Sequence, residues 1–240
     1  MNIILFERAE LELPLQREDR RAIHLLDVLR RREGDTFDAG LIDGPRGKGT
    51  VIAISNAGLS LSFRWGDEPP AMDAITVIIG LPRPQTARAL LRELTSMGIA
   101  VFHFVTTEKG DPNYASSSLW HSGEWRRHLV AGAEQAFCTR LPQVAFGRSL
   151  TETVAQLPND APTQRFALDN YEGTSSLSQI NCAASNVTLA VGSERGWSEG
   201  ERNLLRRSAF TLVHLGPRVL RTETASIAAL VLLKARQGSL

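Results

Sequence analysis

The sequence predicts a two-domain protein of the α/β class, in which a small β-barrel with one helix precedes a domain built on a parallel sheet. Residues 66–70, Gly-Asp-Glu-Pro-Pro, interrupt the chain with two acids and two prolines, which places the boundary between domains 1–68 and 73–240. Before this break, residues 59–65 alternate apolar and polar side chains, as half-buried strands do. After it, apolar runs alternate with longer amphipathic stretches, which is typical of parallel strands joined by crossover helices.

The first domain is expected to hold two further strands and one helix. The strands are predicted at residues 36–42 and 50–54, and the helix at 18–31, with Gly34 ending it. Residues 43–49 between the two strands are rich in glycine, so we predict a hairpin loop with Arg46 and Lys48 at its tip.

The second domain shows strand and helix patterns in alternation. The predicted strands are 75–81, 101–105, 166–168, 187–191 and 212–215, and the predicted helices are 86–97, 125–137 and 224–234. A capping box formed by Ser198 and Glu201 starts one more helix. In helix 86–97 the leucines at 90, 91 and 94 form the apolar side, and Gly98 is a natural terminator.

Composition excludes several classes of protein. The 240 residues include 27 Lys plus Arg against 26 Asp plus Glu, a net charge of +1. This balance argues against a protein that binds nucleic acid through a strongly basic tail. Cys138 and Cys182 stand far apart in sequence and suggest neither a zinc site nor a disulfide framework, which fits a reducing compartment. No apolar run approaches the roughly 18 residues of a membrane span. We therefore expect a cytoplasmic protein with no membrane partner and no metal.

Two strand-to-loop junctions are candidate ligand-binding sites, because ligands in open α/β sheets bind beyond the carboxyl ends of strands. Residues 190–196 lack the glycine spacing of a dinucleotide or phosphate loop, so a tight turn that needs glycine dihedrals is one interpretation. Residues 215–224 place two arginines and a carboxylate before a nearly apolar helix. A ligand site is one interpretation here; the other is a helix start capped by Thr222 with Glu223 complementing the helix dipole.

Taken together, these junctions resemble a known family. Residues 215–225, Leu-Gly-Pro-Arg-Val-Leu-Arg-Thr-Glu-Thr-Ala, look like the C-terminal signature of the RsmE family, SPOUT-class enzymes that methylate N3 of one uridine in 16S ribosomal RNA. Residues 191–198 are similar to that family's Ile-Gly-Pro-Glu-Gly-Gly-Phe/Leu-Ser motif, and 134–142 to its Glu-Gln-x-x-Arg-x-Arg-Val-Pro segment. Residues 24–44 resemble its PUA-like N-terminal domain, so the likeness covers nearly the whole chain.

The resemblance implies a fold and partners that the residue patterns do not show. The second domain would hold a deep trefoil knot with S-adenosylmethionine bent into it, and a homodimer would complete the site. The substrate would be 16S ribosomal RNA or the small ribosomal subunit. The last helix and helix 125–137 would form an apolar dimer interface, because apolar residues of the last helix cover more than one of its faces.

The resemblance also implies residue roles. Arg221 would stabilise the uridine anion, and Glu194 or Glu223 would assist proton removal or attract the sulfonium, unless either carboxylate instead holds the loops together through Arg195 or Arg218. The cofactor-binding set would be Leu168, Gly192, Glu194, Gly196, Leu215, Gly216, Leu220, Thr222, Thr224 and Ala225. The RNA-binding candidates are Arg30, Arg31, Arg46, Lys48 and Arg140, for which solvated charge is the alternative.

The chain departs from the family pattern at several positions. Ser193 and Arg195 replace a proline and a glycine of the cofactor loop, and Phe137 and Cys138 replace a glycine and an arginine. The lysine and glutamate that the family commonly carries in the 93–96 region are Glu93 and Ser96. A diverged, non-catalytic paralogue that binds RNA or aids assembly is therefore the alternative to an active methyltransferase. His24 and His103 are expected to be packed residues rather than catalytic ones.

Overall fold

The computed structural model of the chain describes residues 2–158, 162–182 and 186–239. Its contacts divide the chain into two compact units, and the mixed α/β class expected from the sequence is confirmed. The first unit combines Met1–Ala71 with Val130–Leu141, and the second combines Met72–Leu129 with Pro142–Leu240. Residues 130–141 therefore cluster with the first unit, whereas the sequence predicts a continuous domain from 73 to 240. Among the described residues, each helix is too short or too polar to cross a lipid bilayer.

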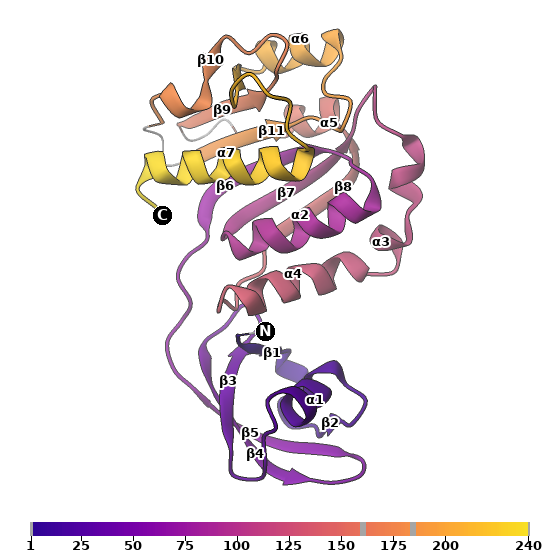
Figure 1. The fold of residues 1–240 in the computed structure, drawn as a ribbon, viewed down its shortest axis with the longest axis vertical. Helices are drawn as coiled ribbons and strands as arrows, with labels where there is room; N and C mark the ends of the chain where they lie inside the picture. Colours follow the sequence, from indigo (N-terminus) through magenta and orange to yellow (C-terminus); the bar gives the residue numbers. More distant parts are fainter. Residues whose placement is uncertain (1, 159–161, 183–185, 240) are drawn as a thin grey trace. The chain divides into compact units, whose positions relative to one another are not determined.

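The first unit is built on a sheet with strand order β1-β3-β4-β5-β2 (Figure 1). The strands are β1 (Ile4–Phe6), β2 (Leu15–Gln16), β3 (Thr36–Leu41), β4 (Arg46–Ile54) and β5 (Gly58–Trp65). Strands β1 and β3 pair in parallel, and the other pairs are antiparallel. Their inward side chains, among them Phe6, Phe37 and Leu59, pack against Leu25 of the helical segment to form the core of this unit.

Strand β4 starts earlier than the glycine-rich pattern predicts. Arg46 and Lys48 lie within the strand and not at a hairpin tip, so that expectation is wrong. Lys48 stands directly opposite Asp38 of β3, and its Nζ lies 2.7 Å from the Asp38 carboxylate. A cross-strand pair of opposite charges favours extending the ladder through glycines that would otherwise favour a loop.

The helical segment of this unit is shorter than predicted. It runs as α1 (Arg20–Ile23) and a π-helical turn, η2 (His24–Val28), after a short 3₁₀ turn, η1 (Arg8–Glu10). Asp19 caps α1 by accepting a hydrogen bond of 2.8 Å from the amide of Arg21. The segment ends before Gly34 because Arg30 already adopts a left-handed conformation with φ of 53°.

Residues 130–141 belong to the first unit because the start of the chain binds them. The amides of Asn2 and Ile3 donate to the carbonyl oxygen of Glu134 at 3.2 and 3.3 Å. Thr139 Oγ1 donates to the carbonyl oxygen of Gly44 at 2.5 Å. Burial raises the pKa of the Glu134 carboxyl, although the amide of Leu5 and the guanidinium of Arg20 both contact it. These contacts join segments more than 90 residues apart, which local sequence patterns do not reveal.

The second unit holds a parallel sheet with strand order β10-β12-β9-β11-β6-β7-β8, counted over the described residues. Its strands are β6 (Asp73–Gly80), β7 (Ile99–Thr106), β8 (Gln143–Ser149), β9 (Thr163–Leu168), β10 (Ser175–Ser176), β11 (Asn186–Val191) and β12 (Phe210–His214). Its helical elements are α2 (Pro84–Ser96), η3 (Pro112–Ser116), α3 (Ser118–His121), α4 (Glu124–Gln135, whose last residues belong to the first unit), α5 (Leu150–Ala155), η4 (Leu177–Gln179), α6 (Glu199–Arg207) and α7 (Thr222–Gln237). The strands predicted in this domain are confirmed with shifted ends, whereas local sequence patterns do not predict β8, β10, α3 and α5.

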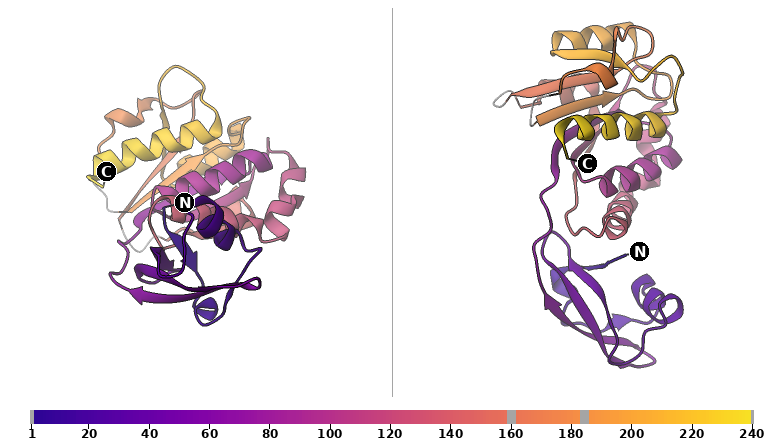
Figure 2. Two further views of the ribbon diagram at one scale, coloured as in Figure 1. Left: turned by 60° about the horizontal axis from the view of Figure 1, so that its bottom comes forward. Right: turned by 60° about the vertical axis from the view of Figure 1, so that its left-hand side comes forward.

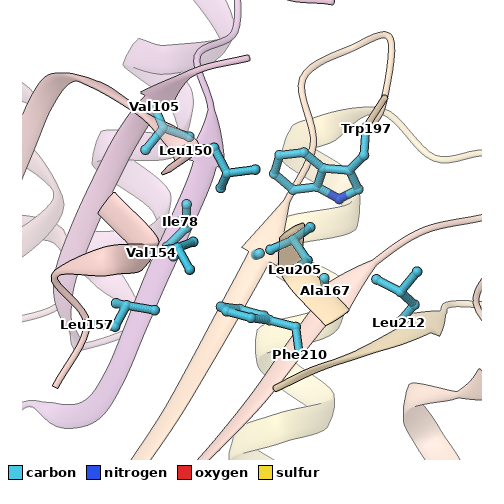
Figure 3. Close-up of a cluster of buried hydrophobic side chains, with 11 residues drawn as sticks. Ile78, Val105, Leu150, Val154, Leu157, Ala167, Trp197, Leu205, Phe210 and Leu212 are labelled. Atoms are coloured by element: carbon cyan, nitrogen blue, oxygen red, sulfur yellow. The ribbon is translucent and has the colours of Figure 1, made fainter. Parts of the chain in front are cut away.

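Helices cover both faces of this sheet. Helices α2 and α7 contact each other on one face, and α5 and α6 cover the other (Figures 1 and 2). Leu90, Leu91 and Leu94 of α2 are fully buried, as their spacing predicts. On the opposite face, α5 and α6 meet the strands in one apolar cluster that includes Trp197 and Phe210 (Figure 3). Ser198 and Glu201 form the predicted capping box at the start of α6.

Candidate active site

Three neighbouring strands of the second unit end at the same edge of the sheet. Strand β9 lies between β12 and β11, and Leu168 at its end is in register with both Val191 and Val213. The segments that follow these three strands therefore meet beyond the carboxyl edge, where ligands of open α/β sheets bind. A cavity of about 380 Å³ lies there.

Both junctions singled out in the sequence line this one cavity. Of the predicted site residues, its lining includes Leu168, Gly192, Glu194, Gly196, Leu215, Leu220, Arg221, Thr222, Glu223 and Ala225. The two predicted cofactor residues outside the lining are Gly216 and Thr224. The loops thus form one site, although 18 or more residues separate them in sequence.

The loop after β11 makes a tight turn that is packed closely against the end of β6. The amide of Gly196 donates to the carbonyl oxygen of Ser193 at 2.9 Å, and Gly196 has a φ of 64°. A Cβ on Gly192 would lie 3.0 Å from the Cα of Gly196, so a side chain there would require Gly196 to shift. A Cβ on Gly80, at the end of β6, would overlap the amide nitrogen of Ser193. The overlap at Gly80 and the positive φ of Gly196 therefore favour glycine at these two positions.

Trp197 fixes the loop after β11 to the end of the neighbouring strand β9. Its indole is fully buried, and Nε1 donates to the carbonyl oxygen of Leu168 at 3.0 Å. Its own carbonyl oxygen accepts a hydrogen bond of 2.9 Å from Nζ of Lys109. The buried indole of Trp197 and these two hydrogen bonds therefore fix the position of the loop after β11.

The loop after β12 presents its side chains outward. Arg218, Val219 and Arg221 are exposed, and all three line the cavity. The amide of Gly216 donates to Nδ1 of His214 at 3.0 Å, which fixes the turn at the start of the loop. Arg221 has extended backbone dihedrals and is the N-cap residue of α7.

Thr222 does not cap the last helix, so that expectation is wrong. It is the first residue of α7, buried, and no side-chain cap is formed at Arg221. Its carbonyl oxygen accepts a hydrogen bond of 2.8 Å from Ser226 Oγ one turn later. Glu223 does lie in the first turn of α7, where its charge complements the helix dipole.

The two candidate carboxylates have different surroundings. Glu194 Oε1 accepts a hydrogen bond of 3.0 Å from the amide of Arg83 and lies 3.7 Å from its guanidinium. Glu194 therefore contacts the residue before α2, whereas the alternative to a chemical role was a pairing with Arg195 or Arg218. Arg195 itself is exposed and lines the cavity.

A buried ion pair, which no sequence motif reveals, supports the wall of the cavity at Asp169. Nε of Arg202 lies 2.6 Å from Oδ2 of Asp169, and their side chains are 9% and 2% exposed. The other carboxylate oxygen, Oδ1, accepts hydrogen bonds from the amides of Tyr171 and Glu172 at 2.8 and 2.7 Å. Asp169 raises the pKa of Arg202 against the opposing effect of burial. Asp169 and Tyr171 line the cavity.

All RNA-binding candidates lie in the first unit. Arg30 is exposed, whereas Lys48 pairs with Asp38 and Arg46 donates to the carbonyl oxygen of Phe137 at 3.5 Å. Arg31 and Arg140 are half-buried, and each has a buried Nε without a hydrogen-bond partner among the described residues.

Both histidines expected to be packed are partly buried. His24 Nε2 and His103 Nδ1 lack hydrogen-bond partners among the described residues. Burial lowers the pKa of each imidazole, and the nearby Arg148 adds to the effect at His103.

Comparison with known proteins agrees with this geometry. The family model of the RNA methyltransferase domain matches residues 68–234. A Treponema pallidum protein named ribosomal RNA small subunit methyltransferase E is 35% identical over 95% of this chain and 89% of its own length. The chain belongs to the ribosomal RNA small subunit methyltransferase E family.

Further relatives and solved structures match over nearly the whole chain. A relative from Borreliella burgdorferi is 29% identical over 97% of both chains. A crystal structure of a family member from Neisseria gonorrhoeae, bound to S-adenosyl methionine, superposes with a TM-score of 0.78 at 20% identity and covers 97% of each chain. The structure of a probable rRNA methyltransferase from Porphyromonas gingivalis superposes with a TM-score of 0.77 at 22% identity, covering 98% of this chain and 99% of its own.

Proposed function

We propose that this chain is an S-adenosylmethionine-dependent methyltransferase that acts on N3 of a uridine in 16S ribosomal RNA of the small subunit. The observation that carries the proposal is the single cavity lined by both loops that resemble family motifs. Family membership supports the reaction class.

The residues around the cavity fit the proposed cofactor. Its volume of about 380 Å³ falls in the range of small-molecule sites. Gly196 has open space where a Cβ would stand, and Leu168, Val191 and Leu215 offer apolar surface for an adenine ring. When bound, S-adenosylmethionine supplies a methyl group carried on a positively charged sulfur.

The reaction needs the imide proton removed from uridine N3 and the resulting negative charge stabilised. Arg221 is exposed at the mouth of the cavity, and its guanidinium would stabilise that charge. Glu194 is engaged by the amide of Arg83, which favours a role in holding the loop. Glu223 is then the carboxylate we assign to accept the N3 proton.

The rest of the chain is assigned to the same substrate. We propose that the first unit is a PUA-like RNA-binding domain that uses Arg30, Arg31, Arg46, Lys48 and Arg140. The second unit would carry the SPOUT-type trefoil knot, with α7 as the helix that closes it. A cytoplasmic location follows from a ribosomal substrate.

A homodimer is part of the proposal. Val231 of α7 is 41% exposed, and Ile227, Ala228 and Leu232 on the same helix are half-buried. These side chains leave an apolar strip that a second copy would cover. Light scattering at micromolar concentration is expected to give twice the monomer mass of 26.3 kDa, and a monomer would contradict this assignment.

Methyl transfer tests the proposed function. Small subunits or 16S RNA that lack the modification are incubated with the protein and methyl-labelled S-adenosylmethionine, and the nucleosides are then separated by mass spectrometry. We expect label in 3-methyluridine at one site. Cofactor-independent RNA binding without any label would favour the non-catalytic alternative, and label on another base or atom would reject the N3 assignment.

A further inference from the structure

Tyr171 is the exposed aromatic ring of the cavity lining. Its side chain is 80% exposed, although it lines the same cavity as Gly192 and Arg221. The tyrosine follows β9 by three residues and so stands on the carboxyl edge of the sheet. Single exposed aromatic residues are common on protein surfaces, so position alone assigns it no role.

The ring is held in place from one side. Arg202 lies under it, with the guanidinium carbon 5.3 Å from the ring centroid. The buried carboxylate of Asp169 fixes that guanidinium and also accepts the amide hydrogen of Tyr171 at 2.8 Å. A ring that is already immobilised loses little conformational entropy when a ligand stacks on its other face.

The surroundings of the ring match the chemistry of single-stranded RNA. Proteins bind unpaired bases by stacking them on aromatic rings, beside cations that contact the phosphates. Arg195 and Arg218 are exposed and line the same cavity as Tyr171. The glycine and apolar residues that suit a cofactor, Leu168, Val191, Gly192, Gly196 and Leu215, are buried or half-buried. The tyrosine ring, in contrast, faces solvent, from which a polymer must approach.

We propose that Tyr171 stacks on an unpaired base of the substrate RNA and positions it at the mouth of the cavity. This inference rests on the proposed function, because it takes RNA as the substrate. Tyr171 is a specificity-determining residue in this account, and Arg202 and Asp169 are the groups that position it.

Binding measurements separate this role from cofactor binding. Affinity for 16S rRNA is measured by filter binding with S-adenosylhomocysteine present, and affinity for S-adenosylmethionine by calorimetry. We expect Tyr171→Ala to weaken RNA binding about tenfold, as loss of one stacked base does, and to change cofactor affinity less than about twofold. Tyr171→Phe keeps the ring and is expected to bind RNA like the wild type. Val219→Ala is the matched control, since Val219 is 82% exposed on the same lining but has no ring.

A cross-linking experiment reports the contact itself. RNA that carries 5-iodouridine is irradiated in the complex, and the cross-linked peptide is identified by mass spectrometry. We expect a cross-link at residue 171 that persists in Tyr171→Phe and disappears in Tyr171→Ala.

Three results would overturn the inference. The first is unchanged RNA affinity in Tyr171→Ala, and the second is a loss of RNA affinity in Tyr171→Phe equal to that in Tyr171→Ala. The third is a loss of S-adenosylmethionine affinity, in place of RNA affinity, in Tyr171→Ala. A wild-type protein that binds rRNA but transfers no methyl group would reject the proposed function alone, because neither RNA readout needs catalysis.

Discussion

The indole Nε1 of Trp197 donates a hydrogen bond to the carbonyl oxygen of Leu168 across 3.0 Å, from a fully buried position. This bond joins the loop after β11 to the end of β9, and both segments line the cavity. The shape of the cavity therefore depends on a residue of the hydrophobic core beneath it (Figure 3).

Replacing Trp197 with phenylalanine tests this dependence. Trp197→Phe retains much of the ring but leaves the Leu168 carbonyl without its partner, which is expected to lower the free energy of unfolding by about 1–3 kcal/mol. Cofactor affinity should fall several-fold in calorimetry, because the loop after β11 is no longer bonded to the end of β9. Trp125→Phe, a tryptophan outside the cavity lining, serves as the control and should leave cofactor affinity unchanged.

Gly80 and Gly216 give opposite expectations for the same substitution. A Cβ on Gly80 overlaps the backbone of Ser193, so Gly80→Ala must displace the cofactor loop and is expected to weaken cofactor binding tenfold or more. Gly216 has a φ of 114° but open space around an added Cβ. Gly216→Ala should therefore cost about 1 kcal/mol of stability through backbone strain, with little loss of binding. Equal effects of both substitutions in calorimetry and chemical denaturation would contradict this account.

Arg221 is expected to act in the chemical step. Arg221→Ala should leave S-adenosylmethionine affinity within about twofold of the wild type and lower the single-turnover rate of methyl transfer about a hundredfold. Arg195→Gly is the comparison, since Arg195 is exposed and its removal should leave cofactor affinity unchanged. Wild-type transfer rates in Arg221→Ala would show that Arg221 has only a structural role.

The Asp169–Arg202 ion pair should contribute strongly to stability. Asp169→Asn removes the nearer charge partner of the buried Arg202 guanidinium and leaves the Glu172 carboxylate, which is 38% exposed and lies 3.4 Å from Nη1 of Arg202. This change is expected to lower the free energy of unfolding by about 3 kcal/mol, the lower end of the range for a broken buried ion pair. Glu93→Gln breaks an ion pair with Arg92 that is about half exposed on each side, and it should change stability by less than about 1 kcal/mol. Urea denaturation of both variants measures the contrast, and similar losses would argue against it.

His103 predicts a pH dependence of stability. Burial lowers the pKa of its imidazole below the ordinary value of 6.5, so the folded state favours the neutral form. The unfolded state then binds more protons as the pH falls through 6.5, and stability is lost over that range down to the lowered pKa. His103→Phe should flatten the slope of the unfolding free energy between pH 7 and 5. A slope identical to the wild type would exclude His103 as its source.

The sequence predicts the elements whose signal is local. Leu90, Leu91 and Leu94 show helical spacing, and the Ser198–Glu201 capping box marks the start of α6. Strand β8 escapes prediction because most of its residues are exposed or half-buried, as at the edge of a sheet, so no apolar run marks it.

Contacts between distant residues account for the rest. The Asp169–Arg202 pair joins residues 33 apart, and Thr139 contacts Gly44 across 95 residues. Motif resemblance identified the two loops of the cavity, while the position of Tyr171 beside them depends on tertiary packing that no motif carries.

Calorimetric titration of S-adenosylmethionine into the wild-type protein tests the central claim, that the loops at 192–198 and 215–225 form one cofactor site. We predict saturable binding with one site per chain, strongly weakened in Gly80→Ala and retained in Arg221→Ala. Absence of saturable heat from the wild-type protein, under conditions in which it is folded, would contradict the account.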